Sequence, residues 1–143
     1  HKVEVLQNAV DQFYSTMRNR SHLTEEIIRW FGGFEMVAAV GAMLQAAELG
    51  MMVLVDGFVM SACMLAACRL NPEILPYVIF THQNEEIGHA KLLSLMKAKP
   101  ILNLNMRLGE GTGALCAYPI IDSAVRMMTE MGSFESAQVT KYF

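Results

Sequence analysis

One long apolar stretch, residues 51–68, limits what this chain can fold into. A bilayer crossing needs roughly 17–25 predominantly apolar residues, so the stretch is about long enough to span a membrane. Asp56 and Gly57 lie in its first third, where a carboxylate in hydrocarbon costs several kcal/mol and a glycine invites a break. The stretch therefore predicts two elements and no membrane span: a buried, β-branched-rich strand over 53–55 and a helix over 58–70.

The rest of the composition excludes other classes of protein. The chain is 53% hydrophobic with a net charge of -3, the reverse of a disordered chain and a poor match to a nucleic-acid-binding module. Its 3 cysteines predict buried thiols in a reducing cytoplasm and no disulfide framework. Only 17% of the residues are charged, and the chain opens on His1 in place of an initiator methionine. We therefore expect a piece of a larger protein.

The predicted elements alternate between helices and short buried strands. Helices are expected over 2–18, 24–31, 34–49, 58–70, 85–98 and 114–131, and strands over 52–55 and 77–81. Strands that are separated by helices and lack hairpin signals predict an α/β fold with a partial parallel sheet and helices packed on it. Two or three strands are few for so much helix, which again indicates part of a larger domain.

A glycine-rich segment at 106–113, MRLGEGTG, is the first candidate for chemistry. It holds Glu110 among three glycines and precedes a predicted helix. Glycines let the backbone approach a ligand closely, and a helix N-terminus offers N–H donors. A glutamate in such a loop suits a general base when its surroundings tune its pKa. The spacing matches neither GxxxxGK[ST] nor GxGxxG, so a nucleotide P-loop is not predicted. A flexible solvent loop is the alternative.

Polar residues follow both predicted strands. Asp56-Gly57 follows the first strand and the segment 81–89 follows the second, and ligands of open α/β sheets bind at these strand ends. The aspartate can equally cap the helix that comes next. Residues 86–89 have the E-x-x-H spacing of half a di-iron site, but a second such motif is missing from the sequence, so we expect no metal. A polar ligand contact by Thr81 or Asn84 is favoured instead.

In combination, these segments resemble the nicotinate-nucleotide–dimethylbenzimidazole phosphoribosyltransferase family of cobalamin biosynthesis. The matching motifs occur in the family's order over nearly the whole chain: HKV at 1–3, GGFE at 32–35, VLVDGF at 53–58, TH at 81–82, EIGH at 86–89 and MRLGEGTG at 106–113. The family's chains are more than twice as long. The resemblance therefore implies that residues 1–143 are the C-terminal catalytic portion of a larger Rossmann-like domain whose N-terminal half is absent.

The resemblance also implies a reaction. The family transfers a phosphoribosyl group from nicotinate mononucleotide to 5,6-dimethylbenzimidazole, which releases nicotinate and forms α-ribazole 5′-phosphate with inversion at the anomeric carbon. The resemblance assigns Glu110 as the general base that takes a proton from the attacking benzimidazole. The chemistry agrees, because the leaving pyridinium already carries a positive charge and needs no acid. The resemblance implies no cofactor, no metal, and a cytoplasmic homodimer.

Six further residues match substrate-binding positions of the family. They are Lys2, Gly57, Asn84, Leu108, Gly109 and Gly111. Lys2 matches a lysine near the nucleotide phosphate, and Leu108 and Gly109 match positions that line the benzimidazole pocket. Asn84 stands where the family is expected to have a serine.

The family's N-terminal half supplies another glycine-rich motif and much of the benzimidazole pocket, so we expect these 143 residues alone to be inactive or nearly so. Two alternatives stay open from the sequence. One is a non-catalytic truncated paralogue, or a module that binds an aromatic base or a partner, in which Glu110 would be retained. The other is a di-iron or zinc helical protein. If the chain is part of a larger domain, some of its Met, Ala and Val side chains should be exposed or covered by another copy.

Overall fold

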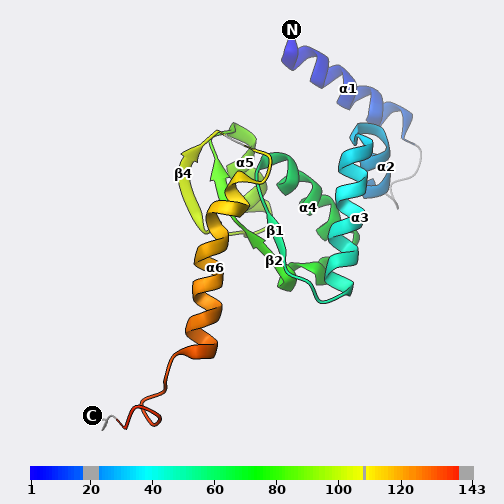
Figure 1. Cartoon of the computed structure of the whole chain (residues 1–143). Coiled ribbons are helices and arrows are strands. Elements are labelled where there is room, and N and C mark those ends of the chain that lie inside the picture. Colours follow the sequence, from blue (N-terminus) through cyan, green and yellow to red (C-terminus); the bar gives the residue numbers. More distant parts are fainter. Residues whose placement is uncertain (18–22, 108, 139–143) are drawn as a thin grey trace. The chain divides into compact units, whose positions relative to one another are not determined.

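The computed structural model describes residues 1–17, 23–107 and 109–138, and it is a helix-rich α/β structure (Figure 1). In chain order, its elements are α1 (Lys2–Thr16), α2 (Leu23–Phe31), α3 (Phe34–Glu48), β1 (Val53–Val55), α4 (Phe58–Leu70), the 3₁₀ helix η1 (Pro72–Tyr77), β2 (Val78–Phe80), β3 (His82–Asn84), α5 (Ile87–Leu95), β4 (Leu102–Met106) and α6 (Thr112–Glu130). The chain divides into two compact units, His1–Val53 with Val59–Val78, and Leu54–Phe58 with Ile79–Phe143. The predicted helix-rich α/β class is confirmed.

The long apolar stretch does split at Asp56-Gly57. β1 and α4 have the predicted bounds, and Val55 at the end of β1 is buried. In α4, Cys63, Met64 and Ala67 are buried as well. The stretch is apolar because it contributes to a protein core. No helix in the described ranges is long and apolar enough to cross a membrane.

The first unit holds α1, α2, α3, η1 and most of α4. Phe13 is the buried residue of α1, and its ring packs against Trp30 and Phe31 near the end of α2. α3 ends at Glu48, and Gly50, two residues later, has a φ of 70°. The N–H of Gly50 donates to the carbonyl of Ala47, and the next N–H donates to Ala46, which is the Schellman pattern that a glycine after a helix favours.

The second unit is built around short strands. β1 pairs with β2, and β3 pairs with β4 in parallel. Thr81 joins the two pairs, because its N–H donates to the Val55 carbonyl at 3.0 Å while its carbonyl accepts from the Leu102 N–H at 2.9 Å. α5 and α6 pack on β3, and α6 also contacts β4. The carboxyl ends of β1 and β2 therefore lead into one region, which holds the candidate site.

Several predicted boundaries are wrong, and those of α5 and α6 bear on the site. The sequence predicts a helix over 85–98, whereas residues 82–84 form β3 and α5 spans only Ile87–Leu95 with Glu86 as its N-cap. β3 contains polar residues only, so the apolar pattern used to recognise strands does not detect it; the parallel ladder with β4 specifies it. α6 begins at Thr112, two residues before the expected start, because a distant side chain caps it.

Candidate active site

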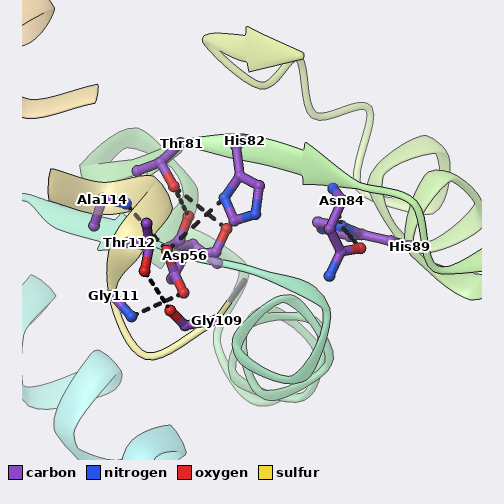
Figure 2. A network of polar contacts seen from close by, with 10 residues as sticks. Asp56, Thr81, His82, Asn84, His89, Gly109, Gly111, Thr112 and Ala114 are labelled. Carbon is purple, nitrogen blue, oxygen red and sulfur yellow. Dashed lines mark hydrogen bonds and ion pairs between the residues drawn. The ribbon is translucent and has the colours of Figure 1, made fainter. Parts of the chain in front are cut away.

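Asp56 is the centre of a polar network in the second unit (Figure 2). Its Oδ2 accepts the backbone N–H of Gly111 and its Oδ1 accepts that of Ala114, each at 3.0 Å. These N–H groups belong to the N-cap and the third residue of α6, where a helix has donors without intrahelical partners and favours a negative charge. The carboxylate is thus the N-terminal cap of α6. The sequence allowed Asp56 to cap the helix that follows it, and that assignment is wrong.

The carboxylate also fixes a tight turn. The N–H of Thr112 donates to the Gly109 carbonyl at 3.2 Å, and between them Glu110 has a φ of 61° and Gly111 a φ of 84°. Two positive φ angles in a closed four-residue turn define type I′. The Oγ of Thr112 closes the turn again, donating to the Gly109 carbonyl at 2.7 Å. A side chain at positive φ costs about 1–2 kcal/mol, so Glu110 occupies a position that would suit glycine better.

Glu110 is exposed at the tip of this turn. The strain of its backbone is sustained by the two hydrogen bonds to Asp56 and the two that close the turn. Backbone strain of this kind gathers at functional sites, where the surroundings hold a residue in a conformation it would not adopt alone. The arrangement presents a carboxylate on a fixed backbone, which is what a positioned general base requires.

His82 lies beside Asp56 and is 1% exposed. Its Nδ1 is 3.8 Å from Oδ1 of Asp56, and neither of its ring nitrogens has a hydrogen-bond partner among the described residues. The ring packs so close to α6 that a Cβ on Gly113 would lie 1.8 Å from Nδ1. Gly113 is therefore required by the ring of His82, and the ring in turn occupies the space beside the capping carboxylate.

A second pair of polar residues consists of Asn84, at the end of β3, and His89, in α5. Nδ1 of His89 is 2.8 Å from Oδ1 of Asn84 and 3.1 Å from the Asn84 backbone nitrogen. A protonated Nδ1 donates to the side-chain oxygen, whereas an unprotonated Nδ1 accepts the backbone N–H, so the tautomer decides which of the two bonds forms. Burial, with a smaller contribution from neighbouring His82, lowers the pKa of His89 and outweighs the opposing effect of Glu86. Gly57 faces His82 and Asn84, since a Cβ there would meet Cε1 of His82 at 3.5 Å and Nδ2 of Asn84 at 3.6 Å.

An open cavity of about 230 Å³ adjoins Asn84 and is lined by Asn84, Glu85, Glu86 and Arg107. The guanidinium of Arg107 forms an ion pair with Glu85 across it. Of the residues with the E-x-x-H spacing, Glu86 is the N-cap of α5 and His89 is bound to Asn84. Among the residues that the structure describes, no group of three His, Cys, Asp or Glu side chains could hold a metal ion.

The structure brings most of the predicted site residues into one unit. Gly57, Asn84, Gly109, Glu110 and Gly111 all lie in the second unit, linked through Asp56 and His82. Lys2 is the first residue of α1, in the first unit. Leu108 lies outside the described residues.

Comparison with known proteins decides the family. Residues 1–139 match the phosphoribosyltransferase family model. The chain belongs to this family. A nicotinate-nucleotide–dimethylbenzimidazole phosphoribosyltransferase of Bacteroides fragilis is 59% identical over all 143 residues, and one of Phocaeicola vulgatus is 54% identical over the same length. The chain spans 40% of the length of each of these two relatives.

A solved relative has the same fold. The crystal structure of a nicotinate-nucleotide–dimethylbenzimidazole phosphoribosyltransferase from Thermus thermophilus matches this chain with a TM-score of 0.80 and 32% identity. The match covers 87% of this chain and 37% of the relative. The family resemblance inferred from the motifs is thereby confirmed. The match also agrees with a chain that represents part of a larger phosphoribosyltransferase fold.

Sequence reasoning assigned no role to two residues of the site, His82 and Gly113. In the sequence, His82 stands out only as part of the TH motif at 81–82, and Gly113 only as one of the three glycines of MRLGEGTG. The His82 ring packs against Gly113, which lies thirty-one positions later in the chain, so the residues next to either one do not predict this contact. Gly113 directly precedes the helix predicted over 114–131, so its place in the sequence is explained by the helix start and gives no hint of a close approach.

Proposed function

We propose that this chain is the C-terminal catalytic portion of an enzyme that transfers phosphoribosyl from nicotinate mononucleotide to 5,6-dimethylbenzimidazole. One observation carries the proposal: Glu110 stands exposed on a strained turn that Asp56 anchors to the helix N-terminus. Membership of the family and 59% identity to a relative named for this reaction support it.

The reaction needs one proton acceptor. One benzimidazole nitrogen attacks C1′ of the ribose and forms the new C–N bond, while the bond from C1′ to the pyridinium breaks and its electron pair stays on the nicotinate nitrogen. The product would carry an extra positive charge unless the N–H on the second ring nitrogen loses its proton. The Glu110 carboxylate takes that proton, and a positioned base of this kind contributes about 10²–10⁴-fold.

The proposed substrate positions follow the strand ends and the turn. Gly57 and Asn84 would contact the nucleotide, which agrees with a bare backbone facing an amide that His89 contacts. Leu108 and Gly109 would border the benzimidazole, and Gly111 is a further proposed substrate-binding position. Lys2 would approach the 5′-phosphate. Free thiols at all described cysteines agree with a cytoplasmic location, and a homodimer is part of the proposal.

We further propose that the chain needs the rest of the enzyme for activity. Large apolar side chains are exposed on both units, including Val3 at 80% on the first and Met128 at 87% on the second. Exposed Met and Val side chains are what the sequence predicts for a piece of a larger domain. The remaining part of the enzyme is the proposed partner for these side chains.

The test compares the chain alone with a chimera, in which the 143 residues replace the matching 40% of the Bacteroides fragilis relative. The chimera should convert nicotinate mononucleotide and 5,6-dimethylbenzimidazole into α-ribazole 5′-phosphate, followed by liquid chromatography, and the chain alone should not. Glu110→Gln in the chimera should lower kcat by about 10²–10⁴-fold with KM retained. The matched control is Glu130→Gln, an exposed acid at the end of α6. An inactive chimera that is correctly folded would refute the function, and an unchanged kcat would remove Glu110 as the base.

A further inference from the structure

The carboxylate of Asp56 caps α6 and also holds the backbone next to Glu110. Its two oxygens are bound by the Gly111 and Ala114 N–H groups, on the two sides of the point where the turn becomes helix. Gly111 is the residue directly after Glu110, and it shares the turn's positive φ angles. A shift of this carboxylate would therefore shift the backbone of Glu110.

Asp56 is poorly placed to act on a substrate itself. The residue is 9% exposed, and each carboxylate oxygen already accepts a backbone N–H at 3.0 Å. His82 covers it from a further side, with Nδ1 at 3.8 Å from Oδ1. A carboxylate that is almost completely buried and whose two oxygens both hold backbone N–H groups orients those groups and is shielded from a ligand.

We propose that Asp56 is a positioning residue for the base. By holding the Gly111 and Ala114 N–H groups it fixes the Gly109–Thr112 turn, which the Thr112 hydroxyl closes, and so fixes where the Glu110 carboxylate stands relative to the acceptor. The inference rests on the proposed function. A displacement of about 1 Å in a reacting group can cost about 10²-fold in rate, so the anchor matters even though it never touches the substrate.

The test uses Asp56→Asn in the chimera, which keeps the size of the side chain but turns an N–H₂ group toward one of the two N–H donors. The control is Asp122→Asn, which removes an exposed carboxylate further along α6 that pairs with Arg126. We expect kcat to fall about 10–100-fold in Asp56→Asn, with little change in the KM for nicotinate mononucleotide, and no change in the control.

Two readouts separate positioning from general support of the fold. In the Glu110→Gln background, Asp56→Asn should cost little more, because a residue that acts through the base has nothing left to position. With benzimidazoles of graded N–H acidity, the loss should shrink as the acceptor becomes more acidic, since a more acidic N–H depends less on the base.

Each outcome decides the inference. Losses that multiply in the double variant, or that are equal for all acceptors, would overturn it while leaving the function of an active wild-type chimera intact. An inactive wild-type chimera would overturn both. If Asp56→Asn does not fold, Thr112→Val tests the same turn from its exposed side, with Thr112→Ser as the conservative rescue. An acidity-dependent loss in Thr112→Val that serine restores supports the inference, and full kcat in Thr112→Val overturns it.

Discussion

Gly113→Ala and Gly41→Ala are the same chemical change at two helical positions, and the structure predicts opposite signs for them. Gly41 lies within α3, where an added Cβ meets nothing within 4 Å. Gly113 is the second residue of α6, where an added Cβ would lie 1.8 Å from Nδ1, 2.5 Å from Cε1 and 2.7 Å from Cγ of His82. The close atoms belong to a buried ring and not to the end of a flexible side chain.

The magnitude follows from two opposing contributions. Alanine favours a helix over glycine by about 1 kcal/mol, which is the whole effect expected at Gly41. Against the His82 ring, an ordinary contact begins near 3.4 Å, so the ring or the start of α6 must move by well over an ångström. Such overpacking costs about 1–3 kcal/mol, and His82 is 1% exposed and cannot turn into solvent. Gly113→Ala should therefore lower the free energy of unfolding by up to about 2 kcal/mol after the helical gain is subtracted.

Urea-induced unfolding followed by circular dichroism measures both variants. Gly41→Ala should raise the midpoint and Gly113→Ala should lower it. The double variant Gly113→Ala with His82→Ala identifies the cause, because removing the ring removes the overlap and the two changes should not add. Equal stabilisation by both alanines would refute the close packing, and additive losses in the double variant would refute the assignment of the overlap to His82.

Two further predictions concern groups whose pKa values the fold shifts. Burial lowers the pKa of His89, so the folded chain disfavours the charged ring. Stability should be full above the unfolded pKa of about 6.5 and fall as the pH drops below it, and His89→Gln should flatten this loss in unfolding titrations below about pH 6.5. Burial raises the pKa of the Cys63 and Cys68 thiols, whereas Cys116 is exposed, so iodoacetamide near neutral pH should label Cys116 first in a peptide map; equal labelling of all three would contradict the described burial.

Local signals predicted the parts of the fold that local physics determines. β1 and α4 could be located because a carboxylate and a glycine interrupt an apolar stretch. The end of α3 could be predicted from Gly50, because glycine readily adopts the positive φ that follows the helix there. η1 likewise begins at a local signal, because the Asn71 side chain accepts the Glu73 N–H and a proline follows it. In each case the residues that specify the element lie within it or next to it.

The unpredicted parts are determined by contacts between distant residues. β3 has no apolar pattern, and its extended conformation comes from pairing with β4. The start of α6 depends on Asp56, which lies more than fifty residues earlier. The position of Glu110 as the candidate base could be proposed from its glycine-rich surroundings and the family motif, but its left-handed backbone could not, because a glutamate gives no local preference for positive φ.

Asp56 connects the two strongest sequence signals of this chain, which at first look independent. In the apolar stretch of residues 51–68 it is the residue that ends β1 and prevents one continuous helix. In the structure its carboxylate caps α6 and holds the turn of the glycine-rich segment. A buried carboxylate is tolerated there because two backbone N–H groups and the positive end of a helix compensate for its lost hydration. An apolar residue at this position would make the stretch continuous and at the same time leave α6 uncapped, so the break in the apolar stretch and the geometry around Glu110 depend on one side chain.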